Sequence, residues 1–202
     1  MRLLYPTLGA LAILAVFTAL IWRQNRDLLR VGAYREFFLR MIPPLSTGVF
    51  VAGLPFVMDL ATVENYLPVL LVYLGGAAIL TALMTRAVTP EERRANGVFR
   101  RGDYPQAAEL YGKLVQEKPL ARNHAFHGAA LGASERYDES VNASTKAIAT
   151  DPEYGLAYYN RALVLRRMNK RTKAVKDLNK ALEADMPRRF RSAAKKILGE
   201  LN

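Results

Sequence analysis

The chain has 202 residues, 51% of them apolar, and 29 Lys or Arg against 18 Asp or Glu give it a net charge of +11. It has no Cys, which excludes disulfides, thiolate chemistry and zinc sites built on Cys. No metal or other cofactor is expected.

An uncharged apolar run covers 3–22 and ends at Trp22. About 20 apolar residues are what a helix needs to cross a bilayer core, and Trp rings favour its boundary. A cleaved signal peptide is the alternative, but no small-x-small cleavage site follows the run. We therefore expect an uncleaved transmembrane helix.

The segment 23–40 is predicted to be an amphipathic helix, because its apolar residues recur at steps of three and four. Such a helix can lie in the membrane interface with its Arg side chains on anionic lipid headgroups. Packing on the chain's own transmembrane helices is the alternative. The residues expected at the interface are Trp22, Arg23, Arg26, Arg30, Arg35 and Arg40.

A second apolar block is too long for one crossing, and two fit it, at 43–62 and 66–84. Asp59 and Glu64 bracket the turn between them. Three prolines, at 43, 44 and 55, leave a kinked or re-entrant first segment as an alternative. The pair Gly75-Gly76 suggests close helix contact.

The charges of the loops predict the orientation. The segment 23–40 and the residues after 84 are Arg-rich, whereas the turn between the later crossings holds only acids. By the positive-inside rule, three spans place the C-terminal half in the cytoplasm and the N-terminus outside. Arg also outnumbers Lys, which suits a bacterial inner membrane protein. We therefore predict a membrane domain over 1–86.

The remaining residues, 87–202, repeat one two-helix pattern three times at intervals of 33 and 34. Tyr104, Tyr137 and Arg171 occupy equivalent positions, each preceded by a small residue at 95, 128 or 162. Gly102 and Asn169 suit helix ends, and prolines at 119 and 152 separate the copies.

This pattern resembles the tetratricopeptide repeat family over about 88–188, on the turns GDYPQA, ERYDES and NKRTKA. The resemblance implies an α-solenoid of three helix pairs, which a C-terminal capping helix at 188–201 would close. Together with the transmembrane helices expected from the apolar segments, the predicted fold is all-α. A nonrepetitive helical bundle is the alternative.

The resemblance also implies a binding site, because the first helix of each pair lines the concave face in this family. Arg and Asn there would suit an acidic peptide. The Lys and Asn clamp of the chaperone-binding members is incomplete, since Glu92 and Phe126 stand at two of its positions. The implied partner-binding residues are Arg93, Asn96, Phe99, Arg100, Phe126, Tyr159, Asn160, Leu163, Arg166 and Arg167.

The stretch 161–196 carries thirteen Lys or Arg and three acids. Nucleic acid is not the expected partner, because no motif or interleaved aromatic residues accompany this charge. Anionic lipid or an acidic protein suits a membrane-tethered surface better, and a solvated face without a partner is the alternative.

No catalytic motif is found, so we expect no enzyme. His124 and His127 have helical spacing, but no third metal ligand is near. The expected function is a membrane-anchored scaffold or assembly factor that binds a protein partner. The alternatives are an accessory subunit held through its transmembrane helices, a lipid- or RNA-tethering module using 161–196, and an enzyme acting through Asp59 or Glu64.

Overall fold

The computed structural model describes residues 4–62, 64–84 and 90–201, which form eleven α-helices. The chain divides into two compact units, Met1–Thr89 and Pro90–Asn202. The domain boundary predicted between 86 and 87 falls outside the described residues. We refer to the described residues of the first unit as the N-terminal unit and to those of the second as the array.

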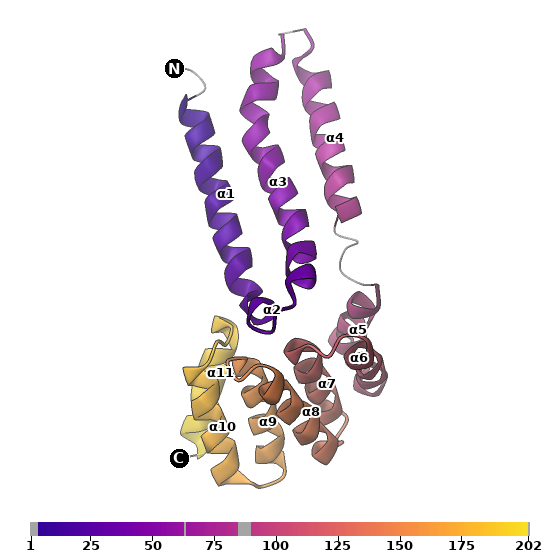
Figure 1. Ribbon diagram of the computed structural model, residues 1–202, viewed down its shortest axis with the longest axis vertical. Helices are drawn as coiled ribbons and strands as arrows, with labels where there is room; N and C mark the ends of the chain where they lie inside the picture. Colours follow the sequence, from indigo (N-terminus) through magenta and orange to yellow (C-terminus); the bar gives the residue numbers. More distant parts are fainter. Residues whose placement is uncertain (1–3, 63, 85–89, 202) are drawn as a thin grey trace. The chain divides into compact units, whose positions relative to one another are not determined.

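The N-terminal unit consists of α1 (Leu4–Gln24), α2 (Arg26–Arg30), α3 (Tyr34–Leu60) and α4 (Tyr66–Met84). Helix α3 lies between α1 and α4 and packs against both (Figure 1). The Tyr73 hydroxyl on α4 donates a 2.6 Å hydrogen bond to the Phe50 carbonyl on α3, and their rings meet edge to face.

The single amphipathic helix predicted over 23–40 is wrong. Helix α2 ends at Arg30, and from Tyr34 onward the chain belongs to α3. The break occurs at Gly32, which adopts a left-handed φ of 71°. The Ala33 N–H then bonds to the Leu28 carbonyl at 2.8 Å, as at many helix C-termini that end in glycine.

Helix α3 continues without interruption through its three prolines and ends at Leu60. The segment is therefore helical throughout, and its path through a membrane stays a prediction. The hydroxyls of Ser46 and Thr47 donate to the Pro43 carbonyl at 2.7 and 3.0 Å. The turn to α4 is closed by Asn65, whose Oδ1 accepts the Thr62 N–H.

Among the described residues, one helix, Tyr34–Leu60, is long and apolar enough to cross a membrane by length and composition. Two shorter apolar helical stretches are Leu11–Arg23 and Tyr66–Leu80. The three crossings expected from the sequence therefore stay a prediction.

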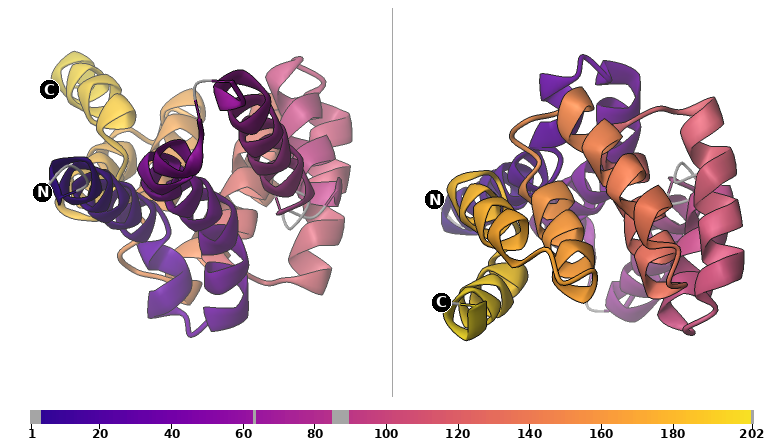
Figure 2. Two further views of the ribbon diagram at one scale, coloured as in Figure 1. Left: turned by 90° about the horizontal axis from the view of Figure 1, so that it is seen from above. Right: turned by 90° about the horizontal axis from the view of Figure 1, so that it is seen from below.

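The array stacks helix pairs in chain order (Figure 2). Within each pair the two helices pack together, and the first helix of the next pair packs on the second helix of the pair before it. The helices are α5 (Pro90–Arg100), α6 (Tyr104–Glu117), α7 (Ala121–Ala133), α8 (Tyr137–Thr150), α9 (Gly155–Arg167), α10 (Arg171–Glu183) and α11 (Arg188–Leu201).

The turns inside the three pairs share one geometry. Each contains a residue with a left-handed φ, namely Gly102 at 86°, Glu135 at 63° and Asn169 at 60°. In each case the next backbone N–H bonds to the carbonyl five residues earlier, at 3.3, 3.0 and 2.8 Å. These bonds satisfy carbonyls that the helix end would leave without partners, so the repeat predicted from sequence is also a repeat of hydrogen bonds.

Small residues let the paired helices approach closely, as at Gly128. The Ser140 hydroxyl donates a 2.6 Å hydrogen bond to the Gly128 carbonyl. A Cβ at Gly128 would lie 2.5 Å from Ser144 Oγ and 3.2 Å from the Ser140 carbonyl oxygen. A larger residue there would force α7 and α8 apart.

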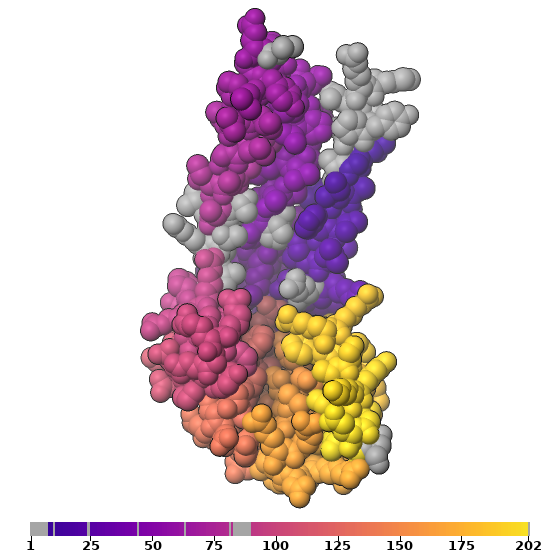
Figure 3. Space-filling view, turned by 180° about the vertical axis from the view of Figure 1, so that it is seen from behind, coloured from indigo at the N-terminus to yellow at the C-terminus, as the bar shows by residue number. Residues whose placement is uncertain are grey.

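Helix α11 covers the end of the third pair (Figure 3), so the capping helix predicted at 188–201 is present at Arg188–Leu201. The Arg191 guanidinium donates to the carbonyls of Leu182, Ala184 and Met186 at 2.8, 3.0 and 3.3 Å. These bonds fix α11 to the C-terminal end of α10. The hydrophobic clusters of the array contain only residues of the array.

Candidate interaction face of the array

The candidate site lies on the first helices of the pairs, α5, α7 and α9. On α5, Arg93 and Arg100 are seven residues apart, which places both on the same side of the helix. Both are exposed, and neither forms a recorded ion pair with a described residue. These two guanidinium groups are available to an acidic ligand.

Asn96 lies between these arginines and is held from inside the array. Its Oδ1 accepts a 2.9 Å hydrogen bond from the Tyr111 hydroxyl on α6, and its Nδ2 donates to the Glu92 carbonyl at 2.8 Å. Burial raises the pKa of Tyr111 to about 12, with Glu92 raising and Arg100 lowering it. Tyr111 therefore stays protonated and keeps donating to Asn96.

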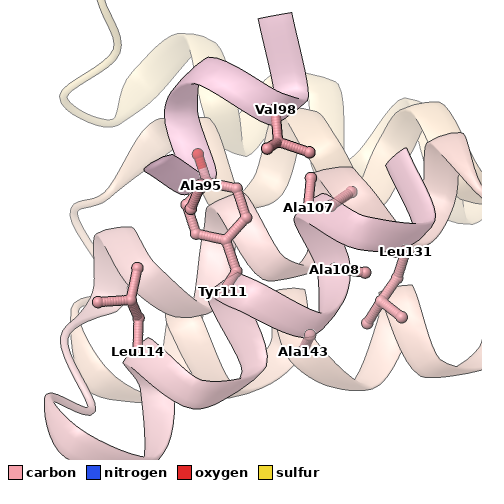
Figure 4. Packing of buried hydrophobic residues seen from close by; sticks show 9 residues of the cluster. Ala95, Val98, Ala107, Ala108, Tyr111, Leu114, Leu131 and Ala143 are labelled. Carbon is pink, nitrogen blue, oxygen red and sulfur yellow. The ribbon is translucent and has the colours of Figure 1, made fainter. Parts of the chain in front are cut away.

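An aromatic cluster lies beneath this side of α5. Phe99 meets Tyr104 and Tyr111 edge to face at 5.3 and 6.5 Å, and Tyr111 stacks on Phe126 of α7 at 5.7 Å. Figure 4 shows Tyr111 among the small side chains of Ala95, Ala107 and Ala108. Phe99 and Phe126 remain only partly buried, so they combine core packing with some exposed apolar surface.

The third pair buries two of the side chains that the sequence placed on the concave face, Tyr159 and Asn160. Asn160 is buried, and its Nδ2 donates a 3.0 Å hydrogen bond to the Ala125 carbonyl of α7. Tyr159 is buried, with its ring 5.7 Å from that of Phe190 on α11. Both residues hold helices together: Asn160 joins α9 to α7 of the pair before it, and Tyr159 packs against α11.

Of the other predicted residues of α9, some have partners inside the array and one is left exposed. Leu163 packs into the cluster shared with α11, and Arg166 forms an ion pair with Glu200 at 3.1 Å. Arg167 is exposed. The structure therefore brings together Arg93, Asn96, Phe99, Arg100 and Phe126 at the α5 end of the array, whereas much of the α9 end is covered by the capping helix.

The two histidines have an internal role. Burial is the main cause of the lowered pKa of His124, and the positive charge of Lys146 lowers this pKa further. Burial is also the main cause of the lowered pKa of His127, followed by His124 and Arg136. No group of three possible metal ligands occurs among the described residues.

In the N-terminal unit, the predicted interface residues cluster around the α1–α3 connection. Arg23, Arg26, Arg30 and Arg35 are exposed and Arg40 is half-buried. The Trp22 ring meets the Phe37 ring edge to face at 5.6 Å. Asp59 and Glu64 are exposed at the α3–α4 turn, a position that gives no support to buried acid–base chemistry.

Sequence reasoning missed an ion pair inside the third repeat. Arg161 binds Asp177 through two hydrogen bonds of 2.6 and 2.8 Å, and a third nitrogen donates to Thr145 at 2.9 Å. The partners are 16 residues apart on different helices, so no helical spacing joins them. Only knowledge of how α9 packs against α10 could have indicated this pair.

Comparison with known proteins supports the repeat. A family model described as "Tetratricopeptide repeat" matches residues 156–185. The chain is 43% identical over 61 residues to Tetratricopeptide repeat protein 36 of Caenorhabditis elegans, covering 30% of this chain and 34% of that protein. It is 27% identical over 105 residues to a DnaJ homolog subfamily C member 7 homolog of Dictyostelium discoideum, covering 50% of this chain and 20% of that protein.

Among solved structures, the first TPR of Spaghetti (RPAP3) bound to the HSP90 peptide SRMEEVD has a TM-score of 0.50 and 22% identity, covering 55% of this chain and 86% of that one. At this identity the likeness concerns the fold. The chain spans about a third or less of the length of the two relatives named above.

Proposed function

Because the chain is a tetratricopeptide repeat protein, we propose that its array binds an acidic peptide segment of a protein partner while the N-terminal unit anchors it in a membrane. The observation that carries the binding proposal is the α5 side of the array. There two exposed arginines flank a fixed Asn96 and the half-buried rings of Phe99 and Phe126.

This chemistry suits a peptide that combines carboxylates with an apolar side chain. Arg binds carboxylates through two parallel hydrogen bonds, and partly exposed aromatic rings offer apolar contact area at little entropic cost. The Spaghetti repeat structure carries a peptide of this type, SRMEEVD. The Lys and Asn clamp that the family resemblance implies is incomplete in this chain, because Glu92 and Phe126 occupy two of its positions.

The support for membrane attachment is the distribution of exposed apolar side chains. In the described residues, every exposed large hydrophobic residue lies between Leu8 and Leu80. In the most apolar window of Tyr34–Leu60, 12% is buried inside the protein, unlike a core helix of a globular domain. So much exposed apolar surface needs lipid or another protein to cover it.

The binding proposal is tested by fluorescence polarisation with the labelled heptapeptide SRMEEVD and its neutral analogue SRMQQVN. We expect R93E/R100E to weaken binding of the acidic peptide at least tenfold, because two attractive charges become repulsive. The matched control is K113E/K146E, which makes the same charge change on α6 and α8, the second helices of the first two pairs. Equal loss in both variants, or preference for the neutral peptide, would contradict the assignment.

An accessory subunit held by its apolar helices is the second candidate function, and an apolar pocket in the N-terminal unit favours it. An apolar pocket of about 540 Å³ lies between α3 and α4 and is lined by residues such as Phe50, Leu54 and Ala78. A Cβ added at Gly75 or Gly76 would meet no atom within 4 Å. Copurification from mild detergent separates the two candidates: the scaffold keeps its partner when residues 1–85 are removed, whereas the accessory subunit loses it.

A further inference from the structure

The net charge of the array is concentrated at its C-terminal end. Residues 90–160 carry nine Lys or Arg and ten Asp or Glu, whereas residues 161–202 carry thirteen Lys or Arg and four acids. The basic end begins in α9 and continues through α10 and α11. It is separate from the α5 side where we place peptide binding.

The structure divides these thirteen cations into two groups. Five have a recorded polar partner inside the array: Arg161 with Asp177, Arg166 with Glu200, Lys180 with Glu183, Arg171 with the Leu201 carbonyl, and Arg191 with three carbonyls. Arg189 lies over the Phe190 ring. Seven are exposed and have no recorded ion pair with a described residue: Arg167, Lys170, Lys173, Lys176, Arg188, Lys195 and Lys196.

The acids of the same region are already engaged. Asp177, Glu183 and Glu200 are in the ion pairs just described, and Asp185 has an interaction of its own within the chain. The positive charge is therefore not neutralised within the array. Lys173 and Lys176 lie on one side of α10, and the four exposed cations of α11 repeat at a spacing of seven on one side of that helix.

The composition of this surface distinguishes between kinds of partner. Five of its seven cations are Lys, whose compact and strongly hydrated charges are depleted from protein–protein interfaces. The described part of the array exposes no large aromatic side chain on which bases could stack. A charged lipid surface needs neither forked nor stacking contacts, only summed positive charge.

Chain connectivity supplies the second argument, which rests on the proposed membrane attachment. Five residues separate Met84 at the end of α4 from Pro90 at the start of α5. An extended chain of that length spans roughly 20 Å. An array tethered so closely to a bilayer would meet anionic headgroups at high effective concentration.

We propose that the exposed cations of α10 and α11, together with Arg167 and Lys170, bind the anionic headgroups of the membrane in which the N-terminal unit is anchored. Binding is electrostatic, because the surface exposes no large apolar side chain that could insert. It therefore weakens as salt screens the charges.

The test uses the full chain in nanodiscs of phosphatidylcholine alone or with 30 mol% phosphatidylglycerol, treated with an amine-acetylating reagent and analysed by mass spectrometry. We expect Lys173, Lys176, Lys195 and Lys196 to react at least threefold more slowly in the anionic discs at 50 mM salt. At 500 mM salt the difference disappears. Lys113 and Lys146, exposed on α6 and α8, are the internal reference and keep their rates. Equal rates in the two kinds of disc overturn the proposal.

A second measurement separates this proposal from anchoring. The array alone, residues 90–202, has hydrophobic clusters made only of its own residues and is expected to sediment with phosphatidylglycerol vesicles. K173E/K176E reduces the bound fraction at least fivefold, whereas K113E/K146E reduces it less than twofold. Sedimentation that ignores lipid charge, or a preference for single-stranded RNA over vesicles, overturns lipid binding. Loss of the full chain from salt-washed membranes would instead contradict anchoring.

Discussion

Single side chains of the array divide into those that hold helices together and those that remain available to a partner. Arg161 and Arg93 illustrate the difference. Arg161 is largely buried and bound to Asp177, whereas Arg93 is exposed on α5. A residue type alone does not decide between these roles, because both are arginines on the first helix of a pair.

The Arg161–Asp177 pair is expected to stabilise the third repeat. Removing one partner of a buried pair leaves the other charge without compensation. Because the Arg161 side chain keeps 21% of its surface exposed, we expect D177N to lower the free energy of unfolding of residues 90–202 by about 2 kcal/mol, less than for a fully buried pair. Urea denaturation measures this loss.

The matched control is E183Q, which removes the exposed partner of Lys180 and should leave the urea midpoint unchanged. In the double variant R161M/D177N the loss should be smaller than the sum of the two single losses. Additive losses would mean that the pair contributes nothing as a pair.

The two histidines make the stability of the array depend on pH. Their pKa values are lowered in the folded state, so the unfolded chain binds more protons as pH falls below about 6.5. The free energy of unfolding is therefore unaffected by these two groups above that pH and decreases as the pH falls below it. We expect the urea midpoint to fall between pH 7.5 and 5.5, and to fall less in H124Q/H127Q. An equal fall in both proteins would show that other groups are responsible.

At the scale of helices, the array depends on close approach within each pair. Gly128 lies where α7 and α8 meet, and Gly97 lies on α5 where an added Cβ would touch nothing within 4 Å. The same substitution at these two positions should therefore have opposite effects.

We expect G128A to destabilise residues 90–202 by about 1–3 kcal/mol, because its methyl group would lie too close to Ser144 Oγ and the Ser140 carbonyl oxygen. G97A should instead stabilise by about 0.5–1 kcal/mol, since Ala is the better helix former. Thermal unfolding followed by circular dichroism compares the two. Similar shifts in the same direction would contradict the packing described here.

At the scale of the whole molecule, the two units differ in what they expose. Large apolar side chains are exposed throughout α1, α3 and α4, whereas the described part of the array exposes none. We expect the full chain to stay in the membrane pellet after alkaline carbonate treatment, and residues 90–202 to be soluble. Release of the full chain by carbonate would show that it lies on the membrane without crossing it.

The absence of Cys makes the predicted topology directly testable. T62C lies in the exposed α3–α4 turn and K113C on the exposed side of α6. With three crossings and a cytoplasmic array, an impermeant maleimide added to intact bacterial cells should label T62C at once and K113C only after lysis. The reverse pattern would invert the orientation, and labelling of both from outside would exclude a cytoplasmic array.

The sequence by itself determined the repeat, since the 33- and 34-residue intervals reflect local backbone requirements: a left-handed residue to end one helix and small residues where helices touch. It also indicated which segments are apolar. Gly32 is a signal of the same kind, and reading it as part of one helix over 23–40 caused the error there.

Only the tertiary structure decided which side chains of the first helices face a partner. Tyr159 and Asn160 were both expected on the concave face, but α11 covers Tyr159 and the Ala125 carbonyl of α7 engages Asn160. Burial depends on contacts between helices far apart in the chain. For the same reason the basic C-terminal stretch could be counted from the sequence, whereas the division into engaged and available cations required the packing of α9, α10 and α11.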